Sequence, residues 1–185
     1  MKTSAASAAA LTFLFAGALS ACDRDADATD AERLAQLEAA ALQVGLNLAL
    51  FDDLDYRVFT QQEWEDLHLS HAQNVIVHWP DGHTTTGIDK HIEDLSSMFV
   101  WAPDTRIEEH PIKVGQGEWT AVIGVIQGTF TQPMPIGNGQ FIEPTGQAYK
   151  VNMATFAHWP NGGPMDEEYL FWDNAELNRQ LGLGN

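Results

Sequence analysis

Apolar residues recur at every third or fourth position over residues 31–54, which is the spacing of one face of an α-helix. Another helix is predicted from Thr60, where Thr-Gln-Gln-Glu has the form of a capping box. A further apolar stripe follows Thr86 and ends before Pro103. The pattern therefore predicts three helices in the first 103 residues, with one β-branched strand at 74–79 between the second and the third.

Beyond Pro103 the chain changes to the patterns expected of β-strands. Strands are predicted at residues 106–114, 118–131, 149–159 and 166–173, with turns rich in Gly and Pro between them. The stretch 133–146 holds three Pro and three Gly and is predicted to be a loop, whose length suggests a function. Helices followed by a meander of strands predict an α+β fold in which a curved antiparallel sheet is wrapped by the N-terminal helices.

The last predicted strand carries the first candidate for chemistry. Glu167, Tyr169, Phe171 and Asp173 share one parity and would lie on one face of this strand. Asn174 is a plausible N-cap for a short terminal helix. A carboxylate at a strand end beside aromatic rings is a candidate acid or base. Asp173 is therefore the first candidate for a catalytic residue.

The N-terminus has the features of an export signal. Lys2 precedes an apolar segment, residues 8–21, that is too short to span a bilayer but suits a signal peptide. The sequence Leu-Ser-Ala-Cys that ends at Cys22 resembles the lipobox of bacterial lipoproteins, which implies a signal peptide at 1–21 and a lipidated Cys22. Ordinary cleavage after Ser20, with a free thiol at Cys22, is the alternative.

The resemblance to lipoproteins also predicts where the protein works. Residues 22–30 would be the lipidated cysteine and an acidic tether, and residues 31–185 the folded domain. We expect an exported lipoprotein anchored at the periplasmic face of a bacterial membrane. The formal charge of −17 argues against a nucleic-acid partner and against anionic lipid headgroups, so the lipid anchor would be the sole attachment to the membrane.

Three stretches resemble the SnoaL-like polyketide cyclase family, also called ester cyclases, within the nuclear-transport-factor-2-like superfamily. These stretches are Val-His-Trp-Pro-Asp-Gly at 77–82, Thr-Gly at 145–146, and Glu-Glu-Tyr-Leu-Phe-Trp-Asp at 167–173 with Gln-Leu-Gly at 180–182. The resemblance implies a curved sheet around an apolar pocket and an intramolecular aldol reaction in which a carboxylate moves a proton. It implies no cofactor and a hydrophobic carbonyl substrate such as a polyketide-like ester. Dimers are common among similar folds, so a homodimer is possible for this protein.

Ring closure by an aldol reaction needs a base for a C–H proton and a donor for the enolate oxygen. Asp173 is the first candidate for the base and Glu167 the alternative. His158, on the preceding strand, and His78, on the opening strand, are the candidate partners. Two structural roles compete with this hypothesis: Asp173 can simply cap the terminal helix, and both histidines can be structural.

A small hydrophobic molecule is the expected ligand, and aromatic side chains would contact it. We expect Trp79, Phe156, Tyr169 and Phe171 to form this wall. A lipoprotein that only binds such a ligand, or a protein partner, is the competing hypothesis, because a fold alone does not determine activity.

Metal binding is not predicted. His68 and His71 are spaced i, i+3 on the predicted second helix, but this spacing lacks the paired signature of a zinc helix, and exposed helix histidines are commoner. The sequence also lacks a phosphate-binding loop and a Gly-x-Ser-x-Gly elbow.

Overall fold

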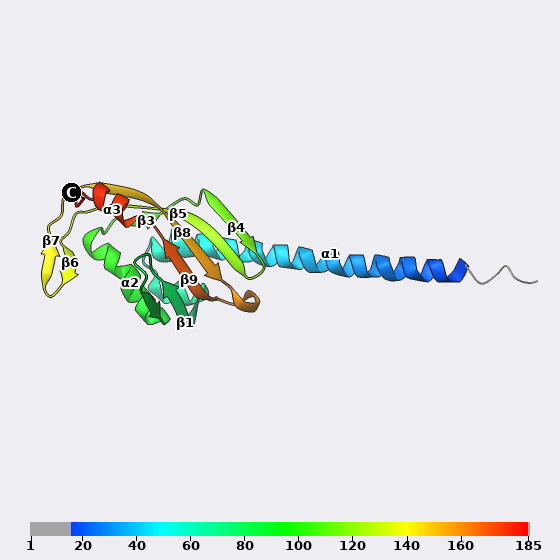
Figure 1. Cartoon of the computed structure of the whole chain (residues 1–185). Helices are drawn as coiled ribbons and strands as arrows, with labels where there is room; N and C mark the ends of the chain where they lie inside the picture. Colours follow the sequence, from blue (N-terminus) through cyan, green and yellow to red (C-terminus); the bar gives the residue numbers. More distant parts are fainter. Residues whose placement is uncertain (1–15, 185) are drawn as a thin grey trace, which may run out of the picture. The chain divides into compact units, whose positions relative to one another are not determined.

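The computed structural model describes the backbone of residues 16–184 and the side chains of residues 29–184 (Figure 1). Most of the predicted signal peptide lies outside the described residues, as does the side chain of Cys22. The chain divides into two units, residues 1–40 and 41–185.

The first unit is described from Ala16 onward as part of α1 (Ala16–Asp53). Residues 23–30, predicted to be an irregular tether, are helical here, and the expected helix start at residue 31 is absent. The stretch 23–40 contains neither Gly nor Pro and is rich in Ala, which accounts for the continuous helix. Among the described residues, Thr29–Phe59 is long and apolar enough to cross a membrane by length and composition, a test that the core helix of a globular domain also passes.

The second unit is an α+β domain built on a seven-stranded sheet in the order β2-β1-β9-β8-β5-β3, with β4 paired to β5. A separate hairpin joins β6 to β7 (Figure 1). The strands are β1 (His71–His78), β2 (Thr84–Thr86), β3 (Arg106–Ile107), β4 (Ile112–Gln116), β5 (Trp119–Thr129), β6 (Met134–Gly137), β7 (Gln140–Ile142), β8 (Ala148–His158) and β9 (Met165–Phe171). The helices are the end of α1, η1 (Leu54–Phe59), η2 (Trp64–Leu69), α2 (Ile88–Trp101), η3 (Pro160–Gly162) and α3 (Asn174–Gln180).

The predicted α+β class is confirmed, but the sheet is mixed, not antiparallel throughout. β1 and β9 run parallel, with Val77 opposite Glu168 and His71 opposite Met165. All other pairs in the sheet are antiparallel, including β5 with β8 and β8 with β9. Periodicity along a single strand does not specify its neighbour, so this pairing was not visible in the sequence.

Two local differences from the predicted elements bear on the site. The predicted second helix is only the 3₁₀-helix η2, and the chain enters β1 at His71. The predicted loop over residues 133–146 contains the β6–β7 hairpin. The first difference matters most, because it separates His71 from the helix that carries His68.

Candidate active site

The alternation of buried and exposed residues in β9 decides which side chains face the interior. Glu168 and Leu170 are buried at 4% exposure each, whereas Phe171 is 52% exposed. Glu167 and Tyr169 share the parity of Phe171 and are partly exposed. The interior face of β9 is therefore the opposite set from the one on which the sequence hypothesis rested.

The interior holds a cavity of about 40 Å³. Its walls are apolar apart from one threonine and four ionisable side chains. The lining residues are Leu54, Asp55, Phe59, His71, Trp79, His91, Leu95, Met98, Ile107, Ile126, Met153, Thr155, Glu168, Leu170 and Trp172. An apolar cavity with few convergent polar groups is the usual form of a small-molecule site.

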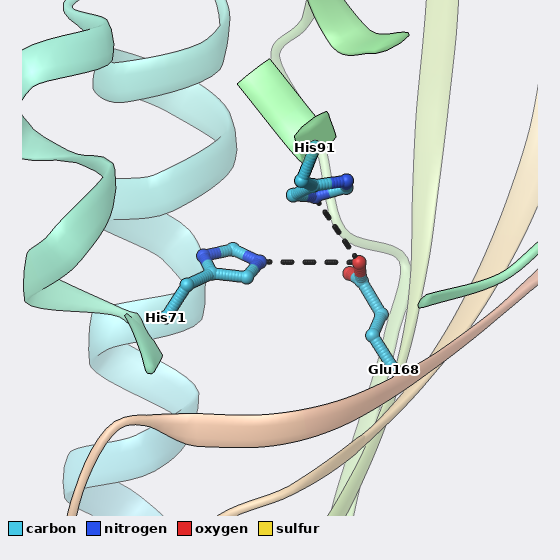
Figure 2. A group of neighbouring side chains, drawn as sticks. All are labelled: His71, His91 and Glu168. Atoms are coloured by element: carbon cyan, nitrogen blue, oxygen red, sulfur yellow. Dashed lines mark ion pairs between the residues drawn. The ribbon is translucent and has the colours of Figure 1, made fainter. Parts of the chain in front are cut away.

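Three of the ionisable side chains converge from different elements, as Figure 2 shows. His71 comes from β1, His91 from the buried face of α2, and Glu168 from β9. Nε2 of His91 lies 3.3 Å and Nε2 of His71 lies 3.9 Å from Oε2 of Glu168. All three side chains are at most 5% exposed, so this cluster is shielded from bulk water.

Burial and mutual charge set the protonation of this cluster. Burial lowers the pKa of His91 to about 4, against the opposing attraction of Glu168. Burial alone would raise the pKa of Glu168, but its interactions with His71 and His91 outweigh burial and bring this pKa below its ordinary value. At neutral pH these shifts favour an ionised Glu168 and a neutral His91.

α2 is placed against β1 by the turn before it. Gly87, at φ 97°, precedes the helix and donates its backbone N–H to the carbonyl of Val75 at 2.8 Å. This left-handed conformation favours glycine. The turn sets the start of α2, and one turn later His91 faces the cavity.

A second polar group reaches the cavity through Asp55, which lies in the π-helical segment η1. Oδ2 of Asp55 is 2.8 Å from Nε2 of His110, and Nδ1 of the same ring is 2.7 Å from Oδ1 of Asp52. Lys113 donates to the other oxygen of Asp52 at 2.5 Å. π-helical segments are frequent at functional sites, because the extra residue redirects a side chain.

The Asp55–His110 pair holds a proton firmly. Burial raises the pKa of Asp55, even though the hydrogen bond from His110 opposes this. Burial lowers the pKa of His110, but its hydrogen bonds and attraction to Asp55 and Asp52 outweigh burial and leave this pKa raised. Both pKa values are raised, so the pair of imidazole and buried carboxylate retains a shared proton.

Asp173 lies outside the cavity and caps α3. Its Oδ1 accepts the backbone N–H groups of Ala175 and Glu176 at 2.9 and 3.0 Å, and the side chain is exposed. Asp173 thus has the structural role that competed with catalysis, the capping of the terminal helix. The N-cap is Asp173, not Asn174 as the sequence predicted. Asp173 is brought together with neither His158 nor His78.

The other predicted site residues lie mostly on the outer face of the sheet. Nε2 of His78 donates a 2.9 Å hydrogen bond to Glu167, and the hydroxyl of Tyr169 donates to the same carboxylate at 2.8 Å. His158 pairs with Asp166 at 2.7 Å. Phe156 is 45% exposed and lies near Phe171, also on this face.

Trp79 is the one predicted ligand-contacting aromatic that lines the cavity. Its indole N–H donates to Thr85 at 2.9 Å, which fixes the ring.

Sequence reasoning missed the residues that actually gather inside: Asp55, His71, His91, His110 and Glu168. One signal was present for Glu168, because it shares the parity of Leu170 and Trp172, and an acidic residue in an apolar set is unusual. His91 likewise lies on the buried stripe of α2 with Ile88 and Leu95. No local signal identifies Asp55 or His110.

Comparisons with known proteins agree with the geometry. Solved structures define a nuclear-transport-factor-2-like, ketosteroid-isomerase-like fold, which is the class of this α+β domain. The SnoaL-like polyketide cyclase family model matches residues 52–181. The chain belongs to this family.

Similar structures include IdmH of Streptomyces antibioticus, a proposed polyketide cyclase, at 21% identity and a TM-score of 0.61 over 76% of this chain and 99% of that one. A proposed SnoaL-like polyketide cyclase from Jannaschia sp. CCS1 has 15% identity and a TM-score of 0.61, over 78% and 94% of the two chains. A Catenulispora acidiphila protein with a ketosteroid isomerase-like fold, in complex with trimethylamine, has 15% identity and a TM-score of 0.54 over 68% and 87%. Among curated proteins no match is found.

Replacing Asp173 tests its capping role. Asp173→Ala should lower the free energy of unfolding by about 1 kcal/mol, because two backbone N–H groups of α3 lose their acceptor. Asp173→Asn should stay within a few tenths of a kcal/mol, since Asn is also a good N-cap. Urea unfolding of both variants measures this. Equal losses in the two variants would show that the negative charge matters, not the cap.

The His110 pair makes a prediction about pH. A histidine whose pKa is raised on folding stabilises the protein fully below its unfolded pKa, about 6.5, and this contribution disappears as pH rises through the folded value. His110→Gln should therefore cost about 3 kcal/mol or more at pH 6, because it breaks a buried pair, and less at pH 9. The groups facing the ring are Asp52, Asp55 and Tyr56, with Lys113 beyond Asp52.

Urea unfolding of wild type and His110→Gln at pH 6 to 9 checks this slope. His158→Gln is the control: the pKa of His158 is also raised, chiefly by Asp166, but its side chain is 24% exposed. This variant should show a smaller difference across the same range. A stability difference for His110→Gln that grows toward pH 9 would contradict the raised pKa.

Proposed function

We propose that the protein is a cyclase or isomerase that uses carboxylate acid/base catalysis on a small hydrophobic carbonyl compound held in the interior cavity. One observation carries this proposal: a largely apolar cavity is lined by Asp55, whose carboxylate is hydrogen-bonded to a buried imidazole. Desolvation makes a carboxylate a stronger base than in water. A cavity that only binds an apolar ligand needs no such pair, and burying it is costly.

Asp55 is the proposed base and His110 its partner. With the shared proton on His110, the Asp55 carboxylate removes a proton from the carbon next to the substrate carbonyl, and the electron pair moves to the carbonyl oxygen. In a cyclase the enolate carbon then bonds to a second carbonyl carbon of the same molecule. Asp55 returns its proton to the new alkoxide; in an isomerase it returns the proton to another carbon. Each cycle leaves the pair as it began.

The enolate oxygen needs a positively polarised partner. In the cluster that lines the same cavity, a histidine N–H can supply this partner, whereas the negatively charged Glu168 cannot. Thr155, 2% exposed, adds a hydroxyl to the lining. Apolar walls from Phe59, Leu95 and Ile126 would hold the carbon skeleton.

The size of the cavity limits the substrate. One water needs about 10–15 Å³ on the same measure, so about 40 Å³ holds a few water molecules. A small ketone or keto ester fits this space better than a multi-ring polyketide, which would require Met98 and Met153 to move. The trimethylamine complex of the Catenulispora protein shows that this fold can hold a small molecule.

Hydrogen exchange on the substrate tests the proposal without knowing the product. Small ketones and keto esters are incubated in D₂O and followed by NMR, which detects loss of the acidic proton. Asp55→Asn should slow this exchange by about 100-fold or more, as expected for loss of a general base. Glu167→Gln, on the outer face, is the matched control and should leave the rate unchanged.

Circular dichroism and thermal unfolding should show that both variants are folded. Exchange that persists in Asp55→Asn at the wild-type rate would overturn the assignment of the base. If wild type binds these ligands but exchanges none of them, the competing hypothesis of a non-catalytic, ligand-binding lipoprotein is supported instead.

We also propose that the mature protein is a lipoprotein anchored at the periplasmic face of the membrane through Cys22. The support is the sequence around Cys22 and the absence of any second cysteine to pair with it. Cys22→Ser should move the protein from the membrane to the soluble fraction, because the lipid can no longer be attached. Ser7→Ala, in the same leader, should not. Membrane fractionation that is unchanged in Cys22→Ser would refute the anchor.

A further inference from the structure

We propose that His71, His91 and Glu168 form a binding site for one divalent transition-metal cation such as Zn²⁺, Co²⁺ or Fe²⁺. Two imidazoles and one carboxylate are a donor set that suits these ions. The three side chains reach one point from β1, α2 and β9 (Figure 2). The sequence alone does not predict this site, because the three ligands are far apart in the chain.

The spacing of the donor atoms fits such an ion. One ligand atom from each side chain lies within 4.8 Å of the other two. A cation about 2.0–2.1 Å from each ligand holds neighbouring ligand atoms roughly 3.0–3.4 Å apart. The 3.3 Å separation of His91 and Glu168 already meets this requirement, and the 3.9 Å separation of His71 and Glu168 needs a small side-chain adjustment.

Hydrogen bonding around Ser70 offers one tautomer of His71 that suits a metal. If the Ser70 hydroxyl donates to the carbonyl of Leu67, 3.2 Å away, it accepts from Nδ1 of His71 at 2.9 Å; in the other tautomer of His71, Nδ1 accepts from the hydroxyl. The proton on Nδ1 leaves Nε2 of a neutral His71 with a lone pair directed at the Glu168 carboxylate. Metal-binding histidines are typically fixed in this way by a hydrogen bond on the other ring nitrogen.

In that tautomer, two hydrogen-bond acceptors face each other in a buried space. Nε2 of His71 and Oε2 of Glu168 are both fully buried, and among the described residues neither has a hydrogen-bond partner. Unpartnered buried polar atoms are costly and call for an explanation. A cation between them satisfies both lone pairs, and Nε2 of His91 completes the set. A second proton on His71 is the competing explanation.

The cation would be partly open toward the cavity, because all three side chains are also part of its lining. If the proposed function holds, an open coordination position there would bind the carbonyl oxygen and stabilise the enolate that Asp55 produces. Metal binding itself does not require that function, because Asp55 supplies none of the three donor atoms.

Metal titration of the full-length protein, purified in detergent and stripped with a chelator, tests the inference. Zn²⁺ binding by calorimetry, and Co²⁺ binding by visible absorption, should give one cation per chain. His71→Gln, His91→Gln and Glu168→Gln should each weaken Zn²⁺ binding by 10-fold or more. Ser70→Ala, which removes only the outer hydrogen bond, should weaken it by about 10-fold.

His68→Gln is the matched control, since His68 is exposed on η2 and close in sequence to the site; its Zn²⁺ affinity should equal that of wild type. Ser70→Ala keeps all ligands, so it remains informative if a ligand variant does not fold. Absence of binding to folded wild type, or binding that survives both Ser70→Ala and His91→Gln, would overturn the site in favour of a protonated His71.

Asp55→Asn separates this inference from the proposed function. That variant should still bind one Zn²⁺ per chain, because all three ligands remain, while losing exchange activity. If wild type binds no metal but Asp55→Asn still abolishes exchange, only the metal site is rejected. If wild type binds metal but catalyses no exchange, only the proposed function is rejected.

Discussion

The parallel pairing of β1 with β9 is the constraint on which the interior depends. It brings the segment that opens the sheet against the segment that closes it, with Val77 opposite Glu168. Antiparallel pairing of β9 with β8 fixes its other edge, so the parity of β9 cannot change without breaking two ladders. Glu168 is therefore held inward, at a cost in desolvation that its neighbours His71 and His91 must offset.

Local patterns were sufficient to predict the fold class and several elements but not the site. The apolar stripe after Thr86 predicts α2, and the α+β class follows from the order of helices and strands; both are confirmed. Parity within the last strand was also visible, but a strand with Glu167, Tyr169 and Phe171 on one side and Glu168, Leu170 and Trp172 on the other does not reveal which side is buried. The buried side is fixed by the register of β9 with β1 and β8, the two strands that pair with its edges.

The candidate site could not be predicted because its members come from separate elements. His71 was assigned to a helix with His68, and only the early end of η2 places it at the start of β1. Asp55 and His110 are joined across the domain by a hydrogen bond that no sequence spacing suggests. Asp173, the residue that a local pattern favoured, has a local role as a helix cap, which is what local sequence can encode.

The interior concentrates ionisable groups to a degree that stability alone does not explain. Replacing a buried ion pair by apolar residues is often neutral or stabilising, so packing gives no reason to keep both the cluster and the Asp55–His110 pair. Asp55 and the cluster line one cavity. Among the described residues, each member of the cluster has a buried atom without a hydrogen-bond partner, whereas Asp55 is paired with His110. The outer face also carries histidine–carboxylate pairs, at His78 and His158, but solvent screens those charges. Desolvation is thus what separates the interior groups from equally close pairs on the surface, and it is the physical reason for placing the chemistry inside.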